Sequence, residues 1–474
     1  MSDETSPLVW SSDVSDPQTK LISSRTTPVT ESPYDLAERN PGATQDKYFN
    51  TSSELPEPIR APSDAWVNDR LRRRCTPDDS SLWTAPEGVR VAAMSKFRHG
   101  FLPLQEHRDL TASIIAAIAD SAESRKVDNP RFKRLFYSLP QVLVSGKPLE
   151  PRENLESDSG AVFTLMGRSG TGRSAFLRRL RSLLGPPVRV LPTITTAPPQ
   201  IWYIPMVKLD WPACNTVEGL CESFRKALVA EIKDPLRNEE VVLRHLQGAA
   251  AVHAVVAACV IFNVGLLAID GACAHHVAGQ YEGILQLVLE LKRYNIPVVL
   301  SCSELFFQRA ALGPPFIREA LGTQVSTLDV LPPAPVEKER RGESPWQRYC
   351  LWFWKAGLFC QDTFPMPAEL VHWTYEVCLG RVGWLSVGFG DLHLKLIRKP
   401  ALLTQLDKKT VTEIFERALL AYEDVRRVIG AVDNNEIIDS DDFMRCMDHF
   451  SSTTARTLKM TAYLEPSRGR RARR

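Results

Sequence analysis

The chain has 474 residues, of which 44% are hydrophobic and 24% charged, and its formal net charge is +2. This is an ordinary globular composition, long enough for two or three folded units plus tails. The small net charge excludes a basic field over the whole molecule. The ten cysteines are scattered and form no C-x-x-C pair, which argues against a zinc ribbon or disulfide scaffold and favours a reducing compartment.

Residues 1–60 are rich in Ser, Thr, Pro and Asp and contain ten acidic against five basic residues. We therefore expect a disordered N-terminal arm over 1–60. The first residues have no basic stretch followed by an apolar one, so we expect no signal peptide and a cytoplasmic location. Residues 61–150 are predicted to form a helical extension, with a short basic stretch at 69–74 and a helix over 108–122.

Between 151 and 335 the sequence alternates between apolar strand patterns and helical patterns. This alternation predicts an α/β fold in which helices cover both faces of a parallel sheet. We expect strands at 161–166, 203–209, 265–269 and 297–301, and helices at 173–184, 217–232, 240–260 and 280–293. The apolar run 248–269 is nearly long enough to span a bilayer, but it contains His253 and Asn263, so we interpret it as a buried helix and strand and expect no membrane contact.

A glycine-rich loop lies between the first strand and the first helix of this region. It reads Gly167-Arg168-Ser169-Gly170-Thr171-Gly172-Arg173-Ser174 and has the setting of a phosphate-binding P-loop. Backbone N–H groups and the helix N-terminus would surround phosphate oxygens. Arginine replaces the phosphate lysine of such loops, which keeps the charge but changes its shape. The predicted nucleotide-binding residues are Gly167, Ser169, Gly170, Thr171, Gly172, Arg173 and Ser174.

Two further strand ends supply polar candidates for the same site. Asp270 ends an apolar strand and is predicted to hold Mg²⁺ together with the hydroxyl of Ser174, next to bound ATP. Ser303 follows the next strand and is a candidate sensor of the γ-phosphate, with a strand-end cap as the equally favoured alternative.

The remaining chain has no further strand pattern. The Pro-rich, charged stretch 331–345 predicts a linker, and 346–430 predicts a small helical lid domain. We expect a polar tail over 431–474 that ends in five arginines within its last seven residues. The aromatic group Trp346, Tyr349, Trp352, Phe353 and Trp354 favours core packing over base stacking. The arginine cluster suits phosphates or an acidic partner, and a solvated tail is the alternative.

Several segments resemble the AAA+ transposition regulators of the TnsC/TniB type. The resemblance covers about residues 100–425 and is most specific at 206–212, Met-Val-Lys-Leu-Asp-Trp-Pro, and at the following helix, 217–224. The run 294–300, the segment 346–354 and the stretch 376–383 also resemble family segments. The resemblance implies a P-loop AAA+ domain followed by a helical lid. It also implies an ATP-binding protein of bacteria that assembles as a ring or filament on double-stranded DNA and links a target selector to a transposase.

The sequence departs from this family at three places that serve hydrolysis. Besides Arg173, Gly271 stands where AAA-type NTPases have the glutamate that activates water, and no confident catalytic residue remains. Leu321 and Gly322 replace a pair of arginines that reaches a neighbour's nucleotide, with Arg309 or Arg318 as substitutes. We therefore expect hydrolysis to be weak or absent, in a homo-oligomer or beside an active relative.

Two other functions remain open at this stage. One is an ATP-independent adaptor that uses the scaffold as an interaction surface. The other is an active NTPase of defence or signalling type, which would need Glu304 as a replacement base. The motif Cys273-Ala274-His275-His276 also suggests a metal site, but a fourth ligand and supporting groups are not visible in the sequence, so we do not expect one.

Overall fold

The structure is a computed structural model, and its described residues all belong to one compact unit, residues 46–474. The predicted N-terminal arm 1–60, residues 240–250 of one expected helix, and the C-terminal arginine cluster lie outside the described residues. The structure describes residues 63–451 and 454, with gaps at 78, 126–128, 146–159, 191–200, 232–250, 323, 334–343, 360–363, 435, 437, 439 and 452–453.

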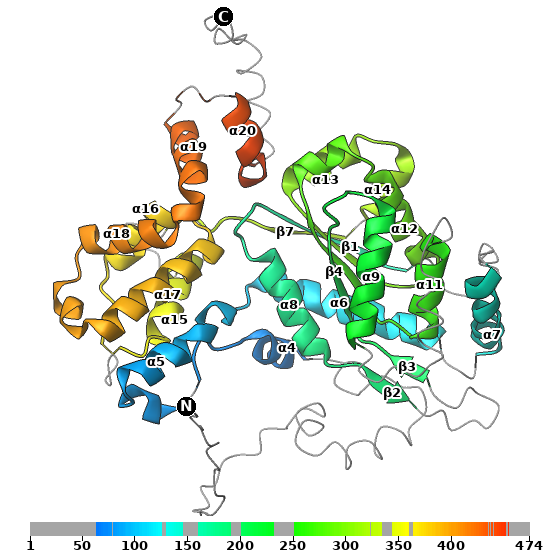
Figure 1. Cartoon of the computed structure of the whole chain (residues 1–474), viewed down its shortest axis with the longest axis horizontal. Coiled ribbons are helices and arrows are strands. Elements are labelled where there is room, and N and C mark those ends of the chain that lie inside the picture. The colour runs from blue at the N-terminus through cyan, green and yellow to red at the C-terminus, as the bar shows by residue number, and fades with distance from the viewer. Residues whose placement is uncertain are drawn as a thin grey trace, which may run out of the picture. The chain divides into compact units, whose positions relative to one another are not determined.

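A parallel five-stranded sheet forms the centre of the α/β region (Figure 1). Its strand order is β4-β5-β6-β1-β7, so β1 pairs in parallel with both β6 and β7. Helices cover the sheet, so the inner strands β1, β5 and β6 are largely apolar, and every residue of β6 is buried. The bounds are β1 Val162–Gly167, β4 Val207–Asp210, β5 Leu267–Ala272, β6 Val298–Cys302 and β7 Gln324–Leu328.

The expected strand 203–209 is divided in the structure. Its first part belongs to β3 (Ile201–Tyr203), which pairs with β2 (Val188–Val190) in a separate antiparallel hairpin, and its second part is β4. The edge strand β7 was not expected from the sequence. Of its five residues, two are exposed, two half-buried and one buried, and the sequence Gln-Val-Ser-Thr-Leu contains no apolar run.

Helices pack on the sheet as the alternation predicts. Helix α9 packs against β4, α12 against β6, and α8 against β1 and β5. Leu, Val, Ile and Phe side chains from these elements form the first hydrophobic core. The bounds are α8 Arg173–Leu184, α9 Val217–Glu231, α11 Ala251–Ile261, α12 Glu282–Arg293, α13 Glu304–Ala311 and α14 Pro315–Ala320.

The chain before the sheet is helical, as expected. Part of the basic stretch 69–74 lies at the end of α4, and the carbonyl oxygens of Arg70, Leu71 and Arg72 accept hydrogen bonds from the guanidinium of Arg179 in α8. This stretch therefore has a structural contact inside the molecule. The bounds are α4 Asp64–Leu71, α5 Glu87–Ala93, α6 Gln105–Ser124 and α7 Pro130–Ser145.

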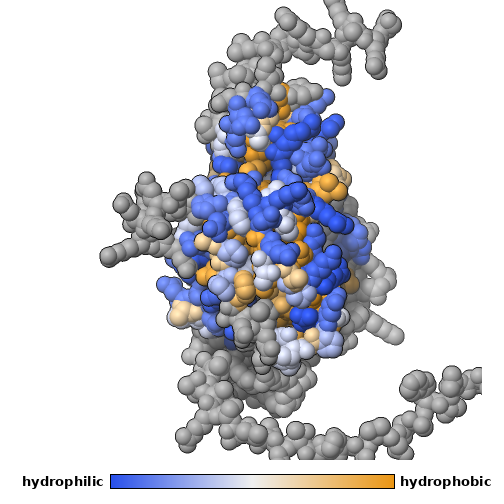
Figure 2. All heavy atoms as spheres, turned by 90° about the vertical axis from the view of Figure 1, so that its left-hand side faces the viewer, coloured by the Kyte–Doolittle hydropathy of each residue, from blue (hydrophilic) through white to orange (hydrophobic). Residues whose placement is uncertain are grey.

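A helical domain follows the sheet and has its own hydrophobic core. Trp346, Tyr349, Phe353 and Trp354 are buried in it, which confirms core packing for this aromatic group. Figure 2 views the side on which α16 and α18 lie, where hydrophilic side chains are interspersed with hydrophobic ones. The bounds are α15 Pro345–Lys355, α16 Leu370–Cys378, α17 Val382–Arg398, α18 Lys408–Ala418, α19 Glu423–Asp433 and α20 Ser440–Cys446.

The C-terminal part of the described chain differs from the expected polar tail. After α20, the short 3₁₀ helix η6 (Met447–His449) returns the chain to the α/β region. Phe443, Cys446, Met447 and Phe450 are all buried in the second core. The burial of these side chains anchors the segment. In the sequence they follow a polar first turn, so the apolar face of the segment is not evident.

The observed architecture is an α/β domain with a parallel sheet, followed by a helical domain, and it confirms the expected fold class. In the described part of the chain, no helix combines the length and the apolar character that crossing a membrane requires. The apolar run 248–269 supplies α11 and part of β5, which lie in the first core.

Candidate functional site: a modified P-loop at the sheet edge

The glycine-rich loop connects β1 to α8 and adopts a conformation that depends on its glycines. Gly170 has φ +84° and Gly172 has φ +104°, both in the left-handed region that glycine enters without steric cost. At Gly167, an added Cβ would lie 2.5 Å from the carbonyl oxygen of Leu328 in β7. The loop is therefore shaped by backbone constraints typical of a phosphate-binding turn, and Thr171 closes it by donating to the Arg168 carbonyl oxygen at 2.9 Å.

Arg173 is the first residue of α8 and is half-buried. Its Nη1 is buried and has no hydrogen-bond partner among the described residues. Its charge also reaches the end of β6: burial raises the pKa of Cys302 to about 12, and the nearby Arg173 opposes that rise. Ser174 is exposed at the start of the helix, where its hydroxyl is available to a ligand.

Two more guanidinium groups lie against the same loop. Arg168 belongs to the loop, and Arg381, at the start of α17, has its Cδ 3.3 Å from the position of a Cβ at Gly170. Both have a buried Nε without a hydrogen-bond partner in the described chain. Burial, together with the positive charge of Arg168, lowers the pKa of Arg381 to about 10. Sequence reasoning did not find Arg381, because only the docking of the helical domain places it here.

Asp270 is buried within β5, where the sequence predicts it. Its Oδ2 lies 3.2 Å from Nζ of Lys208 in β4, and Lys208 also contacts Asp210 at 2.6 Å. The second oxygen, Oδ1, is buried and has no hydrogen-bond partner in the described part of the chain. A buried carboxylate oxygen of this kind fits a divalent cation, and a cation here would compete with the ammonium of Lys208.

Gly271 differs from the expected glutamate in backbone shape as well as side chain. Its φ is +95°, and the pairing register between β5 and β6 shifts between Asp270 and Ala272. No heavy atom lies within 4 Å of a Cβ added there, so space alone would admit a side chain. The obstacle is conformational, because left-handed backbone costs an L-residue roughly 1–2 kcal/mol.

Ser303 serves as the N-cap of α13. Its Oγ accepts a hydrogen bond from the Phe306 amide at 3.2 Å, and its own amide donates to the Ala272 carbonyl oxygen. This hydrogen bond directly supports the alternative interpretation of Ser303 as a strand-end cap. Ser301 is better placed as a polar neighbour of the site: it is the register partner of Asp270, and its buried Oγ has no hydrogen-bond partner among the residues described.

The positions that replace the family's arginine pair have structural roles. Leu321 is 1% exposed, and its carbonyl oxygen accepts a hydrogen bond from Thr164. Gly322 has φ +74°, and a Cβ there would lie 2.3 Å from the Val162 carbonyl oxygen. Side chains as large as arginine do not fit this turn. Arg318 in α14 is exposed and Arg309 in α13 is half-buried, so neither belongs to the P-loop cluster of its own chain.

The C-terminal segment closes one side of the loop. The Ser169 amide donates a hydrogen bond to the carbonyl oxygen of Asp448 at 3.0 Å, and Nη2 of Arg381 donates to the His449 carbonyl oxygen at 2.9 Å. The Asp448 carboxylate accepts from the Ala274 amide at 2.9 Å. A P-loop amide expected to face phosphate is thus paired with the chain's own carbonyl group.

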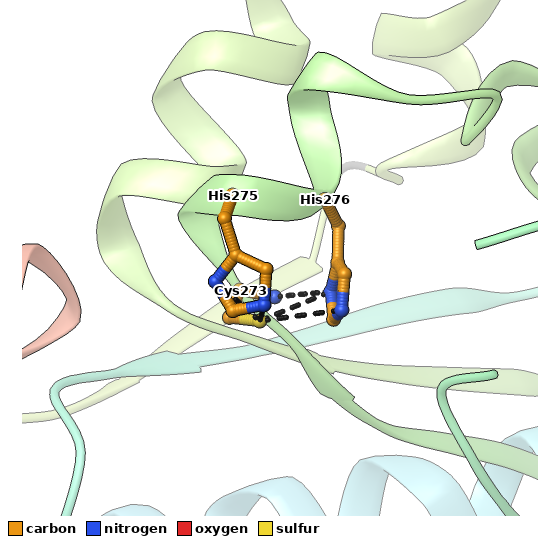
Figure 3. A group of neighbouring side chains, drawn as sticks. All are labelled: Cys273, His275 and His276. Carbon is orange, nitrogen blue, oxygen red and sulfur yellow. Dashed lines mark hydrogen bonds between the residues drawn. The ribbon is translucent and has the colours of Figure 1, made fainter. Parts of the chain in front are cut away.

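The motif after β5 brings three potential metal ligands together (Figure 3). Cys273, His275 and His276 each have a ligand atom within 4.8 Å of the other two. Burial raises the pKa of the Cys273 thiol to about 12, and the charge of Asp448 adds to the effect.

No family model and no curated protein matches the chain. Among solved structures, the Aeropyrum pernix ORC2 protein in its ADPNP–ADP complexes is 13% identical with a TM-score of 0.35, over 71% of this chain and 85% of that one. The ADP form of that protein is 12% identical with a TM-score of 0.34, over 72% and 86% of the two chains.

Cdc6p from Pyrobaculum aerophilum is 10% identical with a TM-score of 0.28, over 57% of this chain and 63% of that one. Similarities at this level carry no inference about activity. The chain's own topology and loop define its class: a P-loop follows a central strand of a parallel sheet, and a helical domain follows the sheet. The fold is that of an α/β domain with a P-loop, followed by a helical C-terminal domain.

Proposed function

We propose that this chain is a nucleotide-binding AAA+ regulator of DNA transposition in which ATP hydrolysis is weak or absent. The observation that carries the nucleotide-binding part is the set of unpaired guanidinium nitrogens around the modified P-loop. Arg168, Arg173 and Arg381 each have one buried nitrogen without a hydrogen-bond partner in the described chain. Three cations with unpaired donors favour an anion with several oxygens, such as a polyphosphate.

The nucleotide would bind at the C-terminal end of β1. Amides of the loop and of the N-terminus of α8 would donate hydrogen bonds to the phosphate oxygens. Asp270 and Ser174 would hold Mg²⁺, which supplies neutralisation of phosphate charge when it is bound. Lys208 would then move from Asp270 towards Asp210 or the phosphates. The residues proposed to contact phosphate are Gly167, Ser169, Gly170, Thr171, Gly172, Arg173 and Ser174.

Slow hydrolysis is proposed because Gly271 stands in place of the water-activating glutamate, and Leu321 and Gly322 stand in place of the arginine pair. Gly271 carries no side chain, and its left-handed backbone resists a simple reversion. A general base is worth about 10²–10⁴-fold in rate, and a trans arginine about 10³–10⁵-fold. Together these departures favour a protein that uses bound ATP to hold a conformation.

The setting in DNA transposition rests on the resemblance to regulators of the TnsC/TniB type over about residues 100–425. In that setting the chain would assemble on double-stranded target DNA and connect a target-selector protein to a transposase. A ring or filament of identical chains, or a mixed assembly with an active relative, would fit such a role. A bacterial, DNA-associated location belongs to the same proposal.

Electron microscopy of the negatively stained protein with duplex DNA tests the proposal, with and without ATP·Mg²⁺. We expect rings or filaments on DNA that need ATP·Mg²⁺ and persist without its turnover. Assembly that requires continuous hydrolysis, or an absence of DNA assembly under both conditions, would contradict it. The variant Arg173→Ala removes one of the residues proposed to contact phosphate and is compared with the parent chain. Its matched control is Arg178→Ala, which changes an arginine on the exposed side of the same helix, α8.

A second candidate is an ATP-independent adaptor, and one contact favours it. The Ser169 amide is already paired with the Asp448 carbonyl oxygen, so the closed loop has one donor fewer for phosphate. A thermal unfolding midpoint unchanged by ATP·Mg²⁺ would support the adaptor, whereas ligand binding to the native state would raise the midpoint.

A further inference from the structure

We propose that Cys273, His275 and His276 form a binding site for Zn²⁺ or a similar transition-metal ion, oriented by Asp448 of the C-terminal segment. The site lies directly after β5, where η3 (Ala274–Ala278) begins. Figure 3 shows the two imidazole rings and the thiol group converging on one point. None of the three ligand residues belongs to the P-loop, so metal binding can be tested without nucleotide.

The distances between the three ligand groups fit a tetrahedral metal centre. Cys273 Sγ lies 3.2 Å from His275 Nε2 and 3.1 Å from His276 Nδ1. With Zn–S about 2.3 Å and Zn–N about 2.0–2.1 Å, tetrahedral geometry requires S···N separations of about 3.6 Å. Each S···N separation is therefore a few tenths of an ångström shorter than that value, and His275, with 70% of its side chain exposed, has room to move.

The structure supplies the supporting groups that the sequence does not reveal. With His275 bound through Nε2, its Nδ1–H faces Oδ2 of Asp448, 4.0 Å away. A carboxylate behind a metal-binding histidine fixes the tautomer and orientation of the ring. Asp448 is itself held by the Ala274 amide, which donates to Oδ1 at 2.9 Å.

His276 is held from the other side. Its ring stacks on Trp211 with centroids 5.5 Å apart, and its carbonyl oxygen accepts a hydrogen bond from Asn215. Trp211 Nε1 in turn donates to Asn215 Oδ1 at 2.8 Å. Binding through Nδ1 would replace the hydrogen bond that this atom now accepts from the Cys273 amide. Three protein ligands leave the fourth position to water or to a group from a partner.

The donor set selects the ion. One thiolate and two imidazoles suit Zn²⁺, Co²⁺ or similar ions, whereas Mg²⁺ and Ca²⁺ prefer oxygen ligands. A metal here would connect the end of β5 to the C-terminal segment, and the same segment pairs with Ser169 in the P-loop. Metal binding would thus hold the closed arrangement of the segment over the loop.

Cobalt titration of the full-length, tag-free protein tests the site. We expect one equivalent of Co²⁺ to bind, with a thiolate-to-cobalt charge-transfer band and the intense d–d bands of a four-coordinate ion, and Zn²⁺ to displace it. Cys273→Ser should abolish the charge-transfer band. His275→Gln, His276→Gln and Asp448→Asn should each lower the affinity by about 10–100-fold. The controls Cys214→Ser and His372→Gln change exposed residues and should leave the titration unchanged.

A second measurement uses the unaltered protein and does not depend on the folding of a variant. Zn²⁺ should slow alkylation of Cys273 but not of the exposed Cys214, as mapped by mass spectrometry of peptides. A charge-transfer band that survives in Cys273→Ser, binding that appears only in large excess of metal, or equal alkylation of Cys273 with and without Zn²⁺ would overturn the proposal. Unchanged affinity in Asp448→Asn would overturn the role of Asp448.

Discussion

The amide of Ser169 in the P-loop donates a hydrogen bond to the carbonyl oxygen of Asp448, 3.0 Å away, near the other end of the described chain. An amide in this loop is one of the donors expected to face a phosphate group. The contact therefore makes the C-terminal segment a competitor of nucleotide at the loop. The Asp448 carboxylate secures the segment through the Ala274 amide.

Asp448→Ala should loosen this competitor and raise the affinity for ATP. The variant removes the hydrogen bond between the Asp448 carboxylate and the Ala274 amide, and such a bond to a charged group is worth about 1.5–3 kcal/mol. Because the segment is then held less tightly against the loop, we expect ATP to bind about fivefold more tightly. Titration with a fluorescent ATP analogue and Mg²⁺, in a buffer freed of transition-metal ions, measures the change without binding of such ions near Cys273. Asp441→Asn, on the exposed first turn of α20, is the control, and lower affinity in Asp448→Ala would contradict the account.

Lys208→Met should destabilise the protein by leaving the Asp270 carboxylate buried without its cation. Asp270 is 4% exposed and Lys208 15% exposed, so solvent screens the pair little. Breaking a buried pair from one side costs about 3–5 kcal/mol, whereas removing both charges costs much less. Urea unfolding of Lys208→Met, Asp270→Asn and the double variant measures this coupling. Additive effects in the double variant would show that the two residues do not stabilise each other.

Gly271→Glu should not restore hydrolysis, although it returns the family's side chain to the sequence. The residue has φ +95°, and a non-glycine residue there costs about 1–2 kcal/mol. We expect a lower unfolding free energy and ATP turnover no faster than in the parent chain. Gly271→Asn is the control, because asparagine tolerates left-handed backbone better than glutamate does. Brisk ATP turnover in Gly271→Glu would show that the backbone adapts.

The stability of the protein should fall below about pH 6.5. Burial lowers the pKa of His393 to about 3, and neither ring nitrogen has a hydrogen-bond partner in the described chain. The unfolded chain binds a proton at about pH 6.5, so between about pH 6.5 and 3 it holds more protons and stability decreases as pH falls. Each such histidine lowers the free energy of unfolding by up to about 1.4 kcal/mol for every pH unit of acidification in this range.

Burial also lowers the pKa of His107 to about 3, so the effect has more than one source. His393→Leu should reduce the slope of unfolding free energy against pH by up to one proton. The exposed residue His372 provides the control, because His372→Gln should leave the slope unchanged. Urea unfolding between pH 7.5 and 5 measures both slopes, and an identical slope in His393→Leu and the parent chain would contradict the assignment.

The sequence predicts the sheet well where strands are buried on both faces. The apolar runs of β1, β5 and β6 fall close to their expected ranges, and the helix expected at 173–184 matches α8. The sequence does not predict the edge strand β7, because its five residues, of which one is buried, form no apolar run. It predicts a polar tail over 440–450, because Asp441 and Asp442 precede the buried Phe443 and Met447.

The site is predictable only where residues lie together in the sequence. The P-loop and Asp270 follow from local motifs, and their roles in binding ATP and Mg²⁺ stay predictions. Four other residues come to the site through strand pairing or through the docking of the helical domain, and spacing along the chain encodes neither of these. They are Lys208, Ser301, Arg381 and Asp448. Ser301 could have been found by noting that it faces Asp270 across the paired strands β5 and β6.

The most direct test of the central claim is to bind radiolabelled ATP·Mg²⁺ to the purified protein and identify the bound nucleotide over time. The account predicts about one ATP per chain that remains ATP for many minutes, with or without duplex DNA. Arg173→Ala should weaken this binding by at least about tenfold, since it removes a charged hydrogen-bond donor. Rapid conversion to ADP that disappears in Asp270→Ala would contradict the claim, as would an absence of binding.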